Sequence, residues 1–169
     1  MGVTIHFEGQ LATEADFERL MQYVRQIAAE KTWLTERIEE KEVKLSRVRD
    51  EEDWDYLGPT KGAVVYVHEA CEPVRFEFDR ELYVQEFVKT QFAGPKVHVD
   101  VAKLLQATER FFRTFKVYDE GENWVTGDET LVAGHIANCN QVIEEELENK
   151  PAARAKVKLS SGRIVDLIR

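Results

Sequence analysis

The spacing of apolar residues in this chain changes between the period of a strand and the period of a helix. Val3, Ile5 and Phe7 alternate with polar residues, which indicates a half-buried strand with His6 on its polar face. A helix is predicted from Thr13, its capping residue, to about residue 31. Its apolar stripe comprises Phe17, Leu20, Met21, Val24 and Ala28. The chain must therefore combine strands with helices.

Several strands without intervening helices are predicted next. A long strand with a solvated face is expected within residues 35–50, and an apolar strand within 63–68. Val74, Phe76 and Phe78 alternate with charged residues and predict a third strand, close enough to form a hairpin with the second. Residues 50–62 combine acids, glycines and a proline and predict a loop. Residues 80–92 fit either a strand or a helix.

Two more helices and a hairpin complete the predicted order of elements. Asp100 is expected to cap a helix, and Thr126 with Glu129 to open another that reaches about residue 148. The stripe of the first contains Val101, Leu104, Leu105, Thr108, Phe112 and Phe115. Residues 157–167 predict a C-terminal β-hairpin. The sequence thus predicts a single α+β domain over residues 1–169, with a mainly antiparallel sheet and about three helices packed chiefly on one face.

The composition fits a soluble cytoplasmic protein. A hydrophobic content of 43% in 169 residues suffices for one core, which argues against disorder. The first residues do not have the pattern of a signal peptide, and no apolar run reaches the roughly 18 residues of a membrane span. Two cysteines are too few for a disulfide framework, so reduced thiols in the cytoplasm are expected.

The charge is negative overall but basic at the C-terminal end. The net charge of −9 disfavours nucleic acid as a partner. Residues 150–169 carry +5, which leaves −14 on residues 1–149. Arg154, Lys156 and Lys158 share one face of the predicted hairpin. They could bind an acidic surface of this chain or a partner, or they could protect an exposed strand edge, which is the more ordinary role.

Each of the two cysteines lies near a histidine. His135 and Cys139 are four residues apart on a predicted helix, and His68 and Cys71 are three apart at a strand end. Together they would supply two nitrogen and two sulfur ligands, a set that a structural zinc accepts. The long separation of the two halves matches no standard zinc finger, and Cys139 falls on an apolar stripe. Packing is therefore the favoured interpretation, with no cofactor expected and zinc as the alternative.

Aromatic residues in acidic loops are candidate interface residues. Trp54 and Tyr56 lie in the acidic segment 50–56, and Trp124 lies in a second predicted turn. Such rings can anchor a protein partner, or they can fold back to cover the core. His98 is expected at the surface before a helix, with no partner evident.

The leading functional hypothesis is a non-catalytic cytoplasmic binding module that acts through contacts with a protein partner or in a homo-oligomer. It rests on the acidic body, the loop aromatics and the lack of recognisable phosphate-binding or nucleophile motifs. An alternative is a small-molecule-binding protein or enzyme with a pocket between sheet and helices, assisted by a metal. A third is an acidic mimic of nucleic acid.

Overall fold

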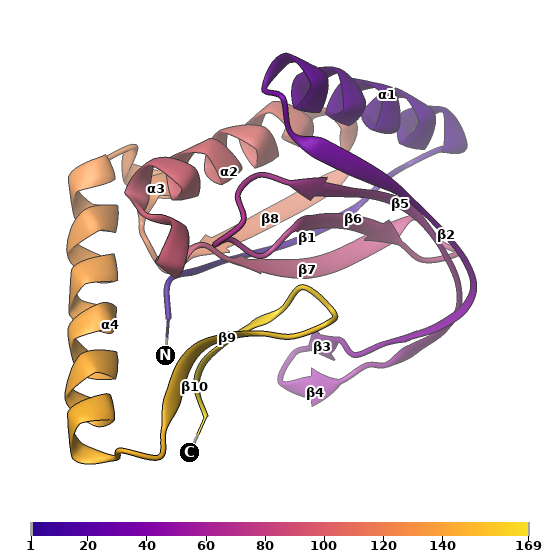
Figure 1. Ribbon diagram of the computed structural model, residues 1–169. Helices are drawn as coiled ribbons and strands as arrows, with labels where there is room; N and C mark the ends of the chain where they lie inside the picture. The colour runs from indigo at the N-terminus through magenta and orange to yellow at the C-terminus, as the bar shows by residue number, and fades with distance from the viewer. Residues whose placement is uncertain (1, 169) are drawn as a thin grey trace.

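The computed structural model describes residues 2–168 and has the predicted α+β architecture (Figure 1). The strands are β1 (Thr4–Gln10), β2 (Leu34–Leu45), β3 (Val48–Arg49), β4 (Glu52–Asp53), β5 (Tyr56–Tyr66), β6 (Val74–Phe78), β7 (Tyr83–Lys89), β8 (Thr114–Asp119), β9 (Arg154–Lys158) and β10 (Ile164–Ile168). The α-helices are α1 (Glu14–Glu30), α2 (Pro95–Thr108), α3 (Asn123–Thr126) and α4 (Glu129–Asn149), and two 3-10 turns span Gln91–Ala93 and Glu109–Phe111.

All strand pairs in the structure are antiparallel. One sheet has the order β7-β1-β8 and a second has the order β2-β5-β6. A tight turn joins β6 to β7, closed by hydrogen bonds from the Asp79 amide to the Tyr83 carbonyl (3.0 Å) and from the Leu82 amide to the Asp79 carbonyl (3.0 Å). The two sheets therefore meet at this turn. Strands β3 and β4 form a small separate ribbon, and β9 and β10 form the predicted C-terminal hairpin.

The core lies between the sheets and helices α1 and α2, which cover one face of the strands (Figure 1). The inward side chains of β1, among them Ile5 and Phe7, meet the apolar stripe of α1 that the sequence predicts. Thr13 caps α1 by accepting a hydrogen bond from the amide of Asp16, as expected. The hairpin β9–β10 lies on the opposite side of the strands (Figure 1). One sheet face is thus left without a helix.

The prediction of a loop over residues 50–62 is wrong, because strand β5 already begins at Tyr56. Gly62 is a strand residue at which a Cβ would lie only 1.6 Å from the carbonyl oxygen of Phe76 on β6. Pro59 sits opposite a bulge in β2, where the register shifts between Glu40 and Val43. Gly62 therefore allows two strands to approach closely, and Pro59 lies at an irregularity in the strand pairing, whereas the sequence pattern suggested a turn.

The second helix begins earlier and ends earlier than predicted. Gly94 and Pro95 open α2, with the proline in the first turn, where its missing amide hydrogen is not needed. Asp100 therefore lies inside the helix and does not cap it. The helix ends at Thr108, and Phe112 and Phe115 reach the core from the segment after it and from β8.

The open choice for residues 80–92 is resolved as strand β7 followed by the 3-10 turn Gln91–Ala93. The short helix α3 lies where only a turn was expected. Within residues 2–168, no helix combines the length and the apolarity needed to cross a membrane.

Candidate functional site

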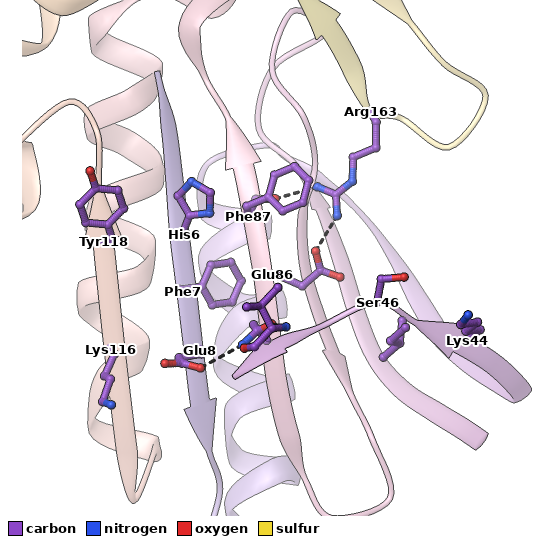
Figure 2. Close-up of a pocket in the computed structure, with 13 residues that line it drawn as sticks. His6, Phe7, Glu8, Lys44, Ser46, Glu86, Phe87, Lys116, Tyr118 and Arg163 are labelled. Carbon is purple, nitrogen blue, oxygen red and sulfur yellow. Dashed lines mark hydrogen bonds and ion pairs between the residues drawn. The ribbon is translucent and has the colours of Figure 1, made fainter. Parts of the chain in front are cut away.

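The face of sheet β7-β1-β8 that points away from α1 and α2 carries a pocket of about 580 Å³. We call it the open-face pocket. Residues from β1, β7 and β8 form its floor, the segment from the end of β2 to β3 forms one side, and the tip of the C-terminal hairpin forms another (Figure 2). Its lining comprises His6, Phe7, Glu8, Lys44, Leu45, Ser46, Val48, Gln85, Glu86, Phe87, Lys116, Tyr118 and Arg163.

Three rings form a row across the floor of this pocket. The strand register places His6 opposite Phe87 on one side and opposite Tyr118 on the other. The imidazole centroid lies 5.9 Å from the centroid of each neighbouring ring, and both contacts are tilted. Figure 2 shows the three rings on the same face of the sheet. Phe87 is 40% exposed and Tyr118 is 67% exposed, so the row presents aromatic surface to the pocket.

A second row, one pleat away, is polar. Glu8 lies opposite Gln85 and opposite Lys116. Its Oε2 accepts hydrogen bonds from the Tyr83 hydroxyl and from Nε2 of Gln85 (3.1 Å), which holds the carboxylate toward β7. Burial and the contact with Glu8 raise the pKa of Tyr83 to about 12, so this phenol remains a proton donor at neutral pH. A smaller cavity of about 310 Å³ adjoins the pocket along Glu8 and Lys116.

The side of the pocket nearest the hairpin is fixed by Arg163. Its guanidinium carbon lies 3.9 Å from the ring centroid of Phe87, while Nη2 lies 2.6 Å from the carboxylate of Glu86. Nη1 donates to the Phe87 carbonyl (2.8 Å) and lies 3.3 Å from Glu72. Burial raises the pKa of Glu86, and the charge of Arg163 opposes that shift. Arg163 thus serves at once as pocket wall and as the anchor of the hairpin.

The carboxylate of Glu72 explains why the hairpin docks where it does. Its side chain is only 1% exposed and accepts hydrogen bonds from the amides of Ile164 (2.8 Å) and Lys89 (2.9 Å). Lys89 in turn forms an ion pair with Asp166 (2.9 Å). A buried carboxylate that receives several donors from two segments holds those segments together. The hairpin therefore contacts the body through Arg163, which meets Glu72 and Glu86, and through Asp166, which pairs with Lys89 of β7.

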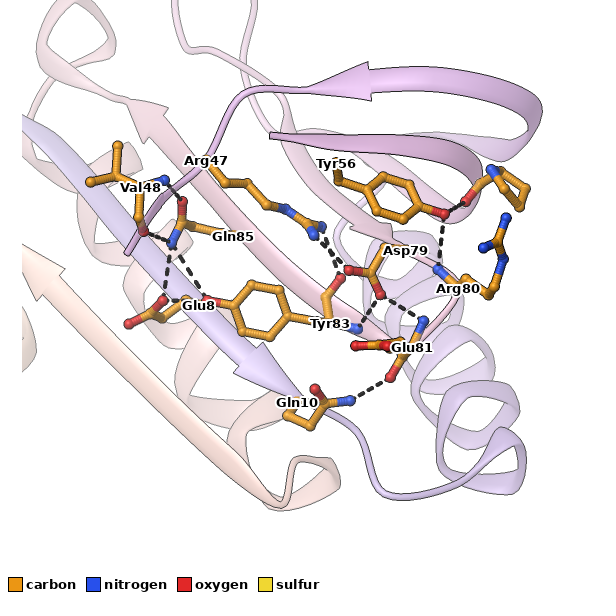
Figure 3. A network of polar contacts seen from close by, with 11 residues as sticks. Glu8, Gln10, Arg47, Val48, Tyr56, Asp79, Arg80, Glu81, Tyr83 and Gln85 are labelled. Carbon is orange, nitrogen blue, oxygen red and sulfur yellow. Dashed lines mark hydrogen bonds and ion pairs between the residues drawn. The ribbon is translucent and has the colours of Figure 1, made fainter. Parts of the chain in front are cut away.

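The opposite side of the pocket is held by a buried arginine (Figure 3). Arg47 precedes Val48, whose backbone amide donates a hydrogen bond to the side-chain oxygen of Gln85 (2.9 Å). The Arg47 guanidinium is paired with Asp79 and also donates to the Tyr83 carbonyl (3.2 Å). These bonds fix the segment between β2 and β3 beside the sheet floor, so the pocket wall is preorganised.

The predicted interface aromatics pack within the protein. The rings of Trp54 and Tyr56 lie 5.7 Å and 5.3 Å from the guanidinium carbon of Arg47, and both side chains are half-buried. Trp54 also receives the guanidinium of Arg49 at 3.7 Å. Trp124 is half-buried and packs against the main core. These contacts give all three rings a structural role.

The predicted basic face of the hairpin is exposed, as the alternation implied. Nζ of Lys158 donates to the Glu69 carbonyl (3.0 Å), and Nζ of Lys156 lies 5.3 Å from the ring centroid of Phe92. Arg154 pairs in register with Ile168. None of these three side chains lines the open-face pocket.

The candidate metal ligands are not brought together as one group. Within residues 2–168, no cluster of three or more His, Cys, Asp or Glu side chains has the arrangement of a metal site. Nε2 of His135 lies 2.6 Å from Glu122, while Nδ1 of His68 accepts from the Ala70 amide (3.0 Å). Cys71 is buried in the main core, whereas Cys139 packs on a small cluster beside Val3 and Val132.

The expectation that His98 lies at the surface without a partner is wrong. His98 is fully buried in α2, with Nδ1 2.7 Å from the Thr90 hydroxyl and Nε2 3.0 Å from Oδ1 of Asp119. Asp119 also accepts from the amides of Gly121 (2.7 Å) and Trp124 (2.9 Å). The histidine therefore connects α2 to the ends of β7 and β8, a connection that only tertiary structure creates.

Comparison of the chain with family models, curated proteins and solved structures finds no match. The function must therefore be inferred from the geometry of the site itself. The sequence pattern places His6 on a polar strand face but does not single out Phe87, Tyr118 or Arg163 as pocket residues. Alternation in residues 114–119 was the available signal for Tyr118, whereas no local pattern indicates that Arg163 reaches β7.

Proposed function

We propose that this chain is a cytoplasmic binding protein and that its open-face pocket receives a small organic ligand. The observation that carries the proposal is the row formed by Phe87, His6 and Tyr118 on the floor of a hollow with preorganised walls. A volume of about 580 Å³ is in the range of small-molecule sites. Apolar rings beside a few fixed polar groups are the usual lining of such sites.

The proposed ligand site lies in a different place from the one that the sequence suggested for a small-molecule pocket. The sequence alternative put a pocket between sheet and helices, but that space is filled by the core, and the hollow lies on the other sheet face. The cytoplasmic location is supported by two free cysteines, one of them buried as a packing residue.

A fragment screen followed by amide chemical shifts of the ¹⁵N-labelled protein tests this function. Ligands are expected to shift amides of β1, β7 and β8, and Tyr118→Leu is expected to weaken them, while Tyr118→Phe retains the ring and the binding. The exposed position of Tyr118 on β8 makes either substitution mild for the fold. Hits that shift only amides of α1, or no hits at all, would contradict the proposed site.

Contacts with a protein partner or a second copy remain the second candidate. The supporting observation is β2, a 12-residue strand at one edge of sheet β2-β5-β6 whose side chains are mostly exposed. A free strand edge can pair with a strand of another chain. Sedimentation velocity over a wide concentration range tests self-association, and a proline in place of Glu39 on β2 should abolish it if this edge is used.

A further inference from the structure

Two polar side chains in the floor of the open-face pocket keep unused hydrogen-bonding capacity. Both bonds to the Glu8 carboxylate end on Oε2, so Oε1 receives none from residues 2–168. The side chain of Lys116 is exposed, and its ammonium forms no ion pair or hydrogen bond with another described residue. The two residues lie directly opposite each other on β1 and β8. An acceptor and a donor therefore stand side by side, one pleat from the ring row.

The structure also shows why this donor and acceptor do not simply satisfy each other. Tyr83 and Gln85 draw the Glu8 carboxylate toward β7 (Figure 3), whereas Lys116 lies on β8, on the other side of β1 (Figure 2). Directly opposite residues have Cβ atoms about 4.5–5.5 Å apart, a spacing that a ligand edge can bridge. A ligand atom that donates to Oε1 of Glu8 and a neighbouring ligand atom that accepts from Nζ of Lys116 would satisfy the hydrogen-bonding capacity of both side chains.

The charge of the lining argues for a ligand that is itself close to neutral. Besides His6, the pocket is lined by three cations, Lys44, Lys116 and Arg163, and by two carboxylates, Glu8 and Glu86. Lys44 is paired with Asp55 (2.9 Å) and Arg163 with Glu86 (2.6 Å). Only Glu8 and Lys116 remain for a ligand, and their charges cancel. A strongly charged ligand would leave one of them uncompensated.

We propose that the ligand of the open-face pocket is a planar heterocycle with a lactam edge, that is, a ring N–H next to a ring carbonyl. The ring would stack on the row of Phe87, His6 and Tyr118, and the edge would donate to Glu8 and accept from Lys116. Aromatic side chains on a sheet can stack against flat heterocycles of many kinds, because each of these has a π-face. A polar edge that matches fixed groups supplies the selectivity. This inference rests on the proposed function and narrows its ligand class.

Three probes of nearly equal size separate the contributions of the ring and the edge. Isoquinolin-1(2H)-one has the lactam edge, its N-methyl derivative has lost the donor, and naphthalene has neither donor nor acceptor. We expect the lactam to shift amides of β1, β7 and β8, and the N-methyl derivative to bind at least about tenfold more weakly, as for the loss of one hydrogen bond to a charged group. Naphthalene should be weaker still.

Two matched variants test the partner of the carbonyl. Lys116→Met keeps an apolar stem of nearly the same length but removes the ammonium donor, and it should weaken binding of the lactam by about tenfold. Lys103→Met, on the exposed face of α2, should leave binding unchanged. Amide shifts of the free variants show whether each remains folded, so a loss of binding can be assigned to the missing ammonium.

The outcomes distinguish this inference from the proposed function. Equal binding of the three probes at the open face, or binding there only of fragments without a lactam edge, would overturn the lactam inference and leave the pocket as a ligand site. Lactam binding that is unaffected by Lys116→Met would also overturn it. The absence of any shift at this face with every probe and fragment would overturn the proposed function itself.

Discussion

Arg47 and Asp79 form a buried ion pair, with Nη1 of the arginine 2.5 Å from Oδ2 of the aspartate. Asp79 also accepts from the amides of Glu81 (2.8 Å) and Tyr83 (3.0 Å), so the pair joins the turn between β6 and β7 to the segment that follows β2. The rings of Trp54, Tyr56 and Tyr83 surround the guanidinium. One wall of the open-face pocket depends on this contact.

Asp79→Asn should therefore destabilise the protein severely. It leaves the Arg47 charge buried without its counter-ion, which costs about 3–5 kcal/mol in comparable sites. Denaturant unfolding measures the change in free energy. The matched control is Glu39→Gln, which removes an ion pair with Arg37 (3.0 Å) in which both side chains are largely exposed, and it should give no measurable change. Similarly small losses in the free energy of unfolding for Asp79→Asn and Glu39→Gln would mean that water reaches the Arg47 guanidinium in solution.

Asp119→Asn should reduce stability at neutral pH but progressively less in acid. Burial alone would raise the pKa of Asp119, but the contacts with His98 and with the amides of Trp124 and Gly121 outweigh it and lower the pKa. A lowered folded-state pKa contributes stability above the unfolded value of about 3.9, and this stability is lost as the pH falls through the folded pKa.

Thermal melts of wild type and Asp119→Asn from pH 7 to pH 3 measure this dependence. The two curves should lie furthest apart above about pH 5 and converge below about pH 4. Asp50→Asn, at an exposed turn residue, should track the wild type throughout. A constant gap between wild type and Asp119→Asn at every pH would show that the carboxylate charge contributes nothing.

The two thiols should differ in reactivity in the native protein. Burial, assisted by the charge of Glu72, raises the pKa of Cys71 to about 12, and this side chain is only 2% exposed. Burial also raises the pKa of Cys139, but this residue is only half-buried. A disulfide reagent at pH 8 should modify Cys139 slowly and Cys71 only after unfolding.

Cys139→Ser is the control for thiol assignment, because it should remove the native-state reaction and leave one thiol titratable in denaturant. Two thiols that react at one rate in the native protein would contradict the buried position of Cys71. Elemental analysis of the same samples tests the zinc alternative, since one equivalent of zinc lost in Cys139→Ser would restore a metal role for this residue.

The C-terminal hairpin should depend on Arg163 far more than on its exposed cations. Arg163→Gln removes contacts with Glu72, Glu86 and the Phe87 carbonyl, and should cost about 1–3 kcal/mol. Changing Arg154, Lys156 and Lys158 together to Gln should leave the melting temperature nearly unchanged, since exposed cations contribute little. Thermal melts of both variants at two salt concentrations test this prediction. A larger fall in melting temperature for the triple variant than for Arg163→Gln would show that the exposed cations, and not Arg163, hold the hairpin.

Local periodicity determined much of this fold. The stripe from Phe17 to Ala28 and the alternation of Ile5 and Phe7 depend only on neighbours in sequence, because an amphipathic element must turn one face to the core. The α+β class, the antiparallel pairing and the C-terminal hairpin follow from such signals. Leu104 was likewise placed correctly on the buried face of its helix.

Tertiary structure decided what depends on partners distant in sequence. Strand position 62 requires glycine because the Phe76 carbonyl oxygen occupies the place of a Cβ. The buried imidazole of His98 is accommodated because Thr90 and Asp119 supply partners for its two nitrogens. The ring row of the open-face pocket exists because the register of β1, β7 and β8 aligns three residues from separate segments. Strand register and the docking of Arg163 are set by long-range contacts, whose energies no local sequence pattern encodes.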